Sequence, residues 1–192
     1  MEILRLVAWL VCGIYATIPA YWMMVHPFAK SWRAARYKLT LLGPTWIVMW
    51  GIAWGVSYRW RHALLYNNPG TWVAAPLLLA ISAFMYVNAG RELSFMRVIG
   101  WHELEPELQP KMLITFGVHS MVRHPMYLGH VCTMLAFTLG SGTVACYGLF
   151  AFALVAGSIM IVFEERELHS RFGSAWEEYC EHTPAIIPVP KN

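Results

Sequence analysis

The sequence predicts an all-α integral membrane protein with five transmembrane helices and an amphipathic C-terminal helix on the cytoplasmic surface. Hydrophobic residues make up 58% of the 192-residue chain and charged residues only 13%. The mean hydropathy of +0.47 is too high for an ordinary soluble domain. Five apolar stretches approach the ~20 residues that a helix needs to cross a bilayer. Ten Trp and nine Tyr suit the aromatic belts at the two membrane surfaces.

The expected spans cover residues 3–25, 41–58, 71–89, 125–139 and 144–163. The fourth is short and crosses the membrane only if it tilts or begins earlier. Pro125 suits the first turn of that helix, where the missing N–H costs nothing. Gly140 and Gly142 close a tight turn, so the last two spans should pack antiparallel. Small residues at helical spacing favour close contact between these two spans: Gly129, Thr133, Ala153 and Gly157.

The helical pattern continues past residue 163. Apolar side chains recur there every three or four residues, at Leu168, Phe172, Ala175, Trp176 and Tyr179. Acidic and basic side chains occupy the remaining positions of the helical wheel. The pattern predicts an amphipathic helix that lies on the cytoplasmic interface.

The basic residues predict the orientation of the chain in the membrane. Eleven of them fall on one side of the five spans: Lys30, Arg33, Arg36, Lys38, Arg91, Arg97, Lys111, Arg123, Arg166, Arg171 and Lys191. Arg5, Arg59 and Arg61 fall on the other. The positive-inside rule then places the N-terminus outside and the C-terminus in the cytoplasm, and we expect a bacterial inner membrane. A formal charge of +3 is too small to indicate a nucleic-acid partner.

Polar residues cluster where two apolar spans reach the membrane surface. The stretch from Arg123 to Gly129 opens the fourth span, and Glu164 and Glu165 close the fifth. The tight turn between these spans brings both clusters to one face. A helix N-terminus and Arg123 suit a carboxylate or phosphate, and the two glutamates suit an ammonium group or ribose hydroxyls. S-adenosylmethionine carries a carboxylate, an amine and a ribose, so it is the expected cofactor.

The same residues carry a family resemblance. "VRHPMYLG", a hydrophobic hairpin and "EERELHSRFGSAWEEYCEHTPAIIP" resemble the superfamily of isoprenylcysteine carboxyl methyltransferases and phospholipid methyltransferases, over roughly residues 90–190. Hydropathy places three spans in residues 1–90, which carry no motif, and the resemblance implies a cofactor-binding core in 91–192 of a single membrane domain. It also implies that Phe172, Gly173, Tyr179, Pro184 and Pro188 belong to a tail that folds over the cofactor.

The residues expected at the cofactor come from both motifs and this tail: Gly117, His119, Arg123, His124, Pro125, Tyr127, Leu128, Gly129, Glu164, Glu165, Leu168 and Tyr179. The residues expected to act in catalysis are Arg123, His130, Glu165 and His182. A thiolate or carboxylate acceptor needs no general base. An amine acceptor needs one, and His130 or Glu165 would supply it. His130 has a second interpretation, as a hydrogen-bonded interior histidine.

His182 departs from the family pattern. Enzymes that methylate isoprenylcysteine usually carry arginine two residues before the tail proline, and this arginine is thought to engage the substrate carboxylate. The histidine here therefore argues against a prenylcysteine substrate.

These observations predict S-adenosylmethionine-dependent methyl transfer to a small amphiphilic or lipid acceptor at the cytoplasmic face, with membrane lipids as further partners. Two alternatives remain. "FGSAWEEYCEHTPAIIP" also resembles the tail of membrane sterol reductases, which indicates an NADPH-dependent reductase. A non-catalytic haem- or metal-binding membrane protein is the other, although the eight histidines lack close ligand spacing and no metal site is expected.

Overall fold

The computed structural model describes residues 1–25, 31, 38–93 and 112–188, without the side chains of 38–40. The described part of the chain contains helices and connections and no strand. The long helices are α1 (Glu2–Val25), α3 (Lys38–Ser57), α4 (Ala75–Glu92), α7 (Pro125–Ser141) and α8 (Val144–Phe172), followed by the short α9 (Ser174–His182). Short 3₁₀ segments are η1 (Tyr58–Trp60), η2 (Pro69–Ala74) and η4 (Gly117–Ser120).

Three helices in the described ranges are long and apolar enough to cross a membrane. They are α1, with 24 residues, the continuous helical segment Pro69–Glu92 formed by η2 and α4, also with 24, and α8, with 29. Since a helix rises ~1.5 Å per residue, each exceeds the ~30 Å of a hydrocarbon core. The expected spans at 3–25, 71–89 and 144–163 therefore coincide with these helices. Spanning by α3 and α7, of 20 and 17 residues, stays a prediction.

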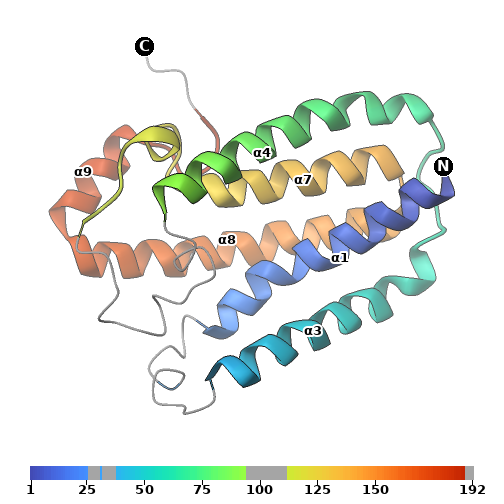
Figure 1. The fold of residues 1–192 in the computed structure, drawn as a ribbon, viewed down its shortest axis with the longest axis horizontal. Helices are drawn as coiled ribbons and strands as arrows, with labels where there is room; N and C mark the ends of the chain where they lie inside the picture. Colours follow the sequence, from blue (N-terminus) through green and yellow to red (C-terminus); the bar gives the residue numbers. More distant parts are fainter. Residues whose placement is uncertain (26–30, 32–37, 94–111, 189–192) are drawn as a thin grey trace.

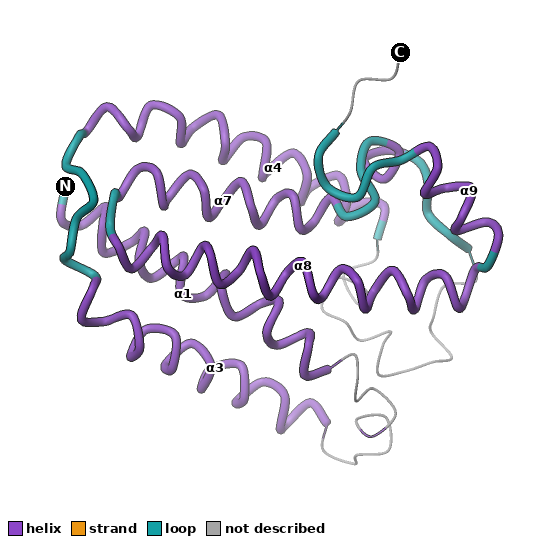
Figure 2. The backbone as a smooth tube through the Cα atoms, turned by 180° about the vertical axis from the view of Figure 1, so that it is seen from behind, coloured by secondary structure: helices purple, strands orange, loops and turns teal. Residues whose placement is uncertain are grey.

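The long helices lie side by side and alternate in direction (Figures 1 and 2). α1 contacts α3, α7 and α8, while α4 packs along α7. The core where α1, α7 and α8 meet contains Cys12, Met134 and Cys146, all buried. The Trp9 indole donates a hydrogen bond to Ser57 Oγ at 2.9 Å and so joins α1 to α3.

The α7–α8 hairpin forms as expected, but its small residues face other helices. Ser82 Oγ on α4 donates to the Gly129 carbonyl at 2.9 Å and is bonded to Thr133 Oγ1 at 2.7 Å. Gly157 on α8 lies opposite Pro19 of α1. For Gly129, Thr133 and Gly157 the expected pairing within the hairpin is therefore wrong, because α4 and α1 cover the faces that carry them.

The C-terminal helical pattern is divided in two. α8 continues to Phe172 as the apolar pattern predicts, but it ends at Gly173, whose φ of +54° leaves the helical region. A residue with a Cβ rarely adopts this conformation. The chain then turns into α9, where Trp176 and Tyr179 are buried. The break directs α9 back towards the start of α7, at one end of the bundle (Figure 1).

Candidate active site

The segment before α7 is bonded to the C-terminal tail. The Arg123 N–H donates to the Pro184 carbonyl at 2.9 Å, and the His124 N–H donates to the Ala185 carbonyl at 3.0 Å. Pro125 then begins α7. The sequence analysis expected free backbone N–H groups at this helix start to bind an anion. Two of the N–H groups here, those of Arg123 and His124, instead bind carbonyls of the tail.

The Arg123 side chain joins three segments. Its Nε and Nη2 donate to Glu165 Oε1 at 2.9 and 2.6 Å. Its Nη1 donates to the carbonyls of Thr183 at 2.6 Å and Cys180 at 3.4 Å. The guanidinium also lies 5.8 Å from the ring centre of Trp176, within cation–π range. With 13% of its side chain exposed, Arg123 holds the start of α7, the end of α8 and the tail together.

His124 stands behind this arginine and contacts both glutamates. Its side chain is only 2% exposed. Nε2 lies 3.2 Å from Glu165 Oε1, and Nδ1 lies 3.7 Å from Glu164 Oε2. The motif histidine thus positions the carboxylates of α8.

Glu92, at the end of α4, is a site residue that the sequence analysis missed. Its Oε1 accepts a hydrogen bond from the Val118 N–H at 3.0 Å, and its Oε2 lies 2.6 Å from His119 Nδ1. Gly117 has a φ of +61°, and a Cβ there would overlap Glu92 Oε1. Glycine is therefore required for the carboxylate to reach η4. The available signal was an acidic residue that ends an otherwise apolar span.

Tyr179 closes the site from α9. Its hydroxyl donates to the His119 carbonyl at 2.5 Å. Burial raises the pKa of Tyr179, so the hydroxyl stays protonated and remains a donor. This bond ties α9 to the segment that leads into the motif.

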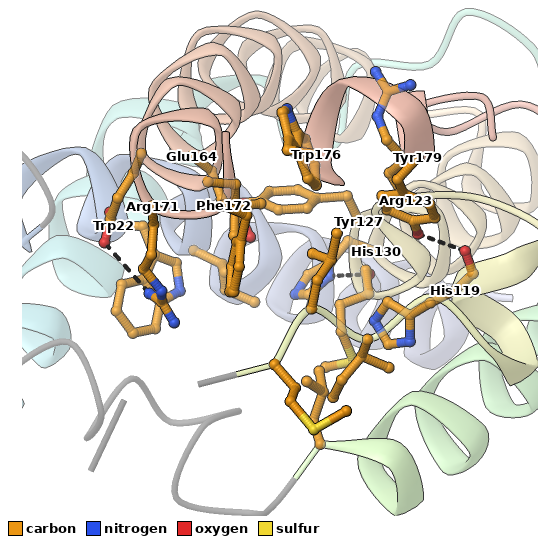
Figure 3. A pocket seen from close by; sticks show the side chains of 18 residues that line it. Trp22, His119, Arg123, Tyr127, His130, Glu164, Arg171, Phe172, Trp176 and Tyr179 are labelled. Atoms are coloured by element: carbon orange, nitrogen blue, oxygen red, sulfur yellow. Dashed lines mark hydrogen bonds and ion pairs between the residues drawn. The ribbon is translucent and has the colours of Figure 1, made fainter. Parts of the chain in front are cut away.

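These segments surround a cavity of about 230 Å³ (Figure 3). Eight of the residues expected from the sequence line it: His119, Arg123, Tyr127, His130, Glu164, Leu168, Phe172 and Tyr179. Other residues line the cavity although the sequence did not predict them there. They include Ile18 and Trp22 of α1, and Met112, Leu113 and Ile114 before η4. No pattern in α1 distinguishes its two wall residues from its other apolar residues.

His130 enters the cavity from α7, one turn above Met126. Its Nδ1 donates to the Met126 carbonyl at 2.5 Å. The rings of Tyr15, Tyr86 and Tyr127 surround it with centre-to-centre distances of 5.3, 5.4 and 6.1 Å. His130 is therefore hydrogen-bonded and also faces the cavity, as each of its two interpretations requires.

The remaining expected residues lie outside the cavity wall. Leu128 packs against the cluster of Met85, Ala89 and Val118. A Cβ on Gly129 would meet the ring of Tyr86, so Gly129 serves the contact between α4 and α7. The other four expected residues belong to the same segments but do not line the cavity: Gly117, His124, Pro125 and Glu165.

His182 is exposed on α9, and its Nδ1 is bonded to the Glu178 carbonyl at 2.9 Å. It does not line the cavity. Of the four expected catalytic residues, Arg123 and His130 line the cavity, while Glu165 and His182 do not.

Comparison with known proteins adds a family match. Residues 70–175, more than half of the chain, match the phospholipid methyltransferase family. This range contains α4, α7, α8 and the motif residues at the cavity. No solved structure matches the chain.

Curated relatives fall into two groups. The chain is 38% identical over 107 residues to a probable protein-S-isoprenylcysteine O-methyltransferase of Oryza sativa subsp. japonica, which covers 53% of this chain and 51% of the relative. It is 35% identical over 72 residues to methanethiol S-methyltransferase 2 of Bradyrhizobium diazoefficiens, covering 37% and 27%. It is 26% identical over 171 residues to the Delta(14)-sterol reductase LBR of Gallus gallus, covering 88% and 22%. The chain thus spans between about a fifth and half of the length of these relatives.

Proposed function

The chain belongs to the phospholipid methyltransferase family, and from this membership we propose that it is an S-adenosylmethionine-dependent methyltransferase acting on a small amphiphilic or lipid acceptor. Its long apolar helices and its family make it an integral membrane protein. The observation that carries the proposal is the junction at Arg123. There the α7 motif, Glu165 of α8 and the tail meet beside one cavity.

The wall chemistry fits such a methyl donor. When bound, the donor supplies a methyl group on a positively charged sulfur. Tyr127, Phe172 and Trp176 offer aromatic faces to that charge. Glu164, with 32% of its side chain exposed, suits the ammonium group or the ribose hydroxyls.

The cavity is small for a ligand of this size, so the tail that borders it has to move. Its volume of about 230 Å³ is below the ~300–1,000 Å³ usual for ligand pockets. We therefore expect the tail to shift when the donor binds. All three guanidinium nitrogens of Arg123 are bonded within the protein, so this residue controls how far the tail can move.

The site lies at the membrane end that we assign to the cytoplasm. In this proposal α3 and α7 cross the bilayer with α1, α4 and α8, which gives five spans. The start of α7 and the end of α8 then share a face with most basic residues, so the cofactor enters from the cytoplasm and the N-terminus lies outside. A bacterial inner membrane fits this orientation.

The acceptor is proposed to be lipophilic. Ile18, Trp22 and Met126 are apolar residues of the cavity wall, and in this proposal an apolar acceptor enters past them from the bilayer. Relatives are named for methanethiol and for isoprenylcysteine, which are small or lipid-linked. His182 lies outside the cavity, so its proposed role is contact with a part of the acceptor that remains outside.

A second candidate is an NADPH-dependent reductase, because the alignment with the sterol reductase covers 88% of this chain. Thermal unfolding of the detergent-purified protein distinguishes the two. S-adenosylhomocysteine at 100 times its dissociation constant should add ~2.7 kcal/mol of stability, while NADPH should add none. A shift with NADPH alone would replace the methyltransferase proposal by the reductase. An absorption spectrum of the same sample checks for haem.

A further inference from the structure

Glu92 and His119 form a pair suited to removing a proton inside the cavity. A general base needs an unprotonated atom that faces the substrate. It also gains from a neighbour that stabilises the charge formed when the proton arrives, as a carboxylate does for imidazolium.

His119 meets both conditions. It lines the cavity, and its Nδ1 lies 2.6 Å from Glu92 Oε2. Because a carboxylate accepts the hydrogen bond, the neutral imidazole carries its proton on Nδ1 and its lone pair on Nε2. No described residue is hydrogen-bonded to Nε2. The side chains of His119 and Glu92 are 10% and 12% exposed, so water screens their interaction only weakly.

The other histidines near the site fail one condition each. His130 lines the cavity, but its Nδ1 is bonded to a backbone carbonyl and tyrosine rings surround it. An imidazolium there would have no carboxylate partner among the described residues. His124 contacts Glu164 and Glu165 but lies outside the cavity wall. Its carboxylate partner thus distinguishes His119 from His130, and its place in the cavity wall distinguishes it from His124.

We propose that the Glu92–His119 pair is the general base of the transfer and that the methyl acceptor is therefore a group that must lose a proton. A thiol, as in the relative named for methanethiol, a phenol or an amine meets this requirement. This inference rests on the proposed function, because it names the acceptor class of the same site. A carboxylate acceptor is ionised at neutral pH and needs no base, so the pair would have no role with it. A thiol or phenol is largely protonated there.

His119 Nε2 takes the proton of the acceptor's S–H, O–H or ammonium N–H group. The electron pair left on that atom forms the new bond to the methyl carbon, while the bond between this carbon and the donor's sulfur breaks and leaves its pair on that sulfur. Glu92 stabilises the imidazolium until the proton passes to water.

The first test needs no methyl donor. Para-nitrophenol is only partly ionised near neutral pH and absorbs differently when ionised, so its spectrum reports whether the bound probe has lost its proton. The wild-type protein should increase the ionised fraction of the bound probe. His119→Asn should abolish the increase, and Glu92→Gln, which keeps an oxygen acceptor for the Val118 N–H, should reduce it.

The second test measures methyl transfer to thiols of increasing acidity. With weakly acidic alkyl thiols, His119→Asn should lower the rate by about 100-fold or more. With thiols that are already ionised, the loss should approach zero. His169→Asn is the matched control, because His169 forms a similar pair with Glu177 at 2.8 Å but is exposed. This control should leave both measurements unchanged.

Three results would overturn the inference. The first is an equal rate loss across the thiol series, and the second is an ionised fraction in His119→Asn that equals the wild type's. The third is loss of S-adenosylhomocysteine binding in His119→Asn, which would make His119 part of the donor site. If the wild-type protein itself binds no S-adenosylhomocysteine, the proposed function fails. The probe spectra still report separately whether the pair removes protons.

Discussion

Arg123 and Glu165, 42 residues apart, are joined through two nitrogens of the arginine to one carboxylate oxygen, at 2.9 and 2.6 Å. The same guanidinium donates to the Thr183 carbonyl. The two motifs and the tail are therefore connected through one side chain. An unpaired charge at this poorly hydrated position would be costly.

Replacing Arg123 by alanine should abolish binding of S-adenosylhomocysteine. The change leaves Glu165 without its partner and releases the tail, a loss of ~2–5 kcal/mol for a buried charge pair. Glu165→Ala should have a similar effect for the same reason. Isothermal titration of the detergent-purified variants measures both.

Arg59→Ala is a suitable control for these variants, because Arg59 is exposed and stacks on Trp60, away from the cavity. Its affinity should match the wild type. Unchanged affinity in Arg123→Ala would contradict a role of the junction in donor binding.

His182→Ala should leave the affinity for S-adenosylhomocysteine nearly unchanged and alter turnover or acceptor choice. The side chain is exposed and lies outside the cavity, so no donor contact is lost. Titration and a turnover assay with several acceptors separate the two effects. If this variant loses donor binding as completely as Arg123→Ala, our division between donor and acceptor residues is wrong.

Gly117→Ala should destabilise the protein. The backbone at +61° costs an alanine ~1–2 kcal/mol, and the added Cβ would also displace Glu92 from η4. Thermal unfolding measures the loss. Gly90→Ala on α4 is the control, since a Cβ there meets nothing within 4 Å, and it should gain ~0.5–1 kcal/mol. Equal stability of the two variants would argue against the strain at Gly117.

Cysteines placed at Leu65 and Ile187 should be labelled from opposite sides of the membrane. Both side chains are exposed, at 59% and 76%, and the proposed topology puts Leu65 outside and Ile187 in the cytoplasm. A membrane-impermeant thiol reagent applied to intact cells should therefore reach only position 65. Equal labelling of both positions would refute five spans with the N-terminus outside.

The sequence alone determined the helices and the residues that carry the family motif. Hydropathy and helical spacing are local properties of the sequence. The expected spans near α1 and α4 therefore agree with the structure to within a few residues. The expected span near α8 begins correctly, but the helix continues further. The turn at Gly140 and Gly142 likewise predicted the α7–α8 hairpin. Arg123, Tyr127 and Glu164 could be named because they stand in recognisable motifs.

Tertiary structure decided which polar groups pair and which helices share a face. Glu92 reaches His119 only because α4 packs along α7 and ends beside η4. The small residues of α7 face α4 because α8 packs mainly on α1. No local pattern in the sequence shows this choice of neighbouring helices. In a membrane, polar side chains must find partners within the protein, and those partners come from helices distant in the sequence. The partner of each motif residue is thus a property of helix packing.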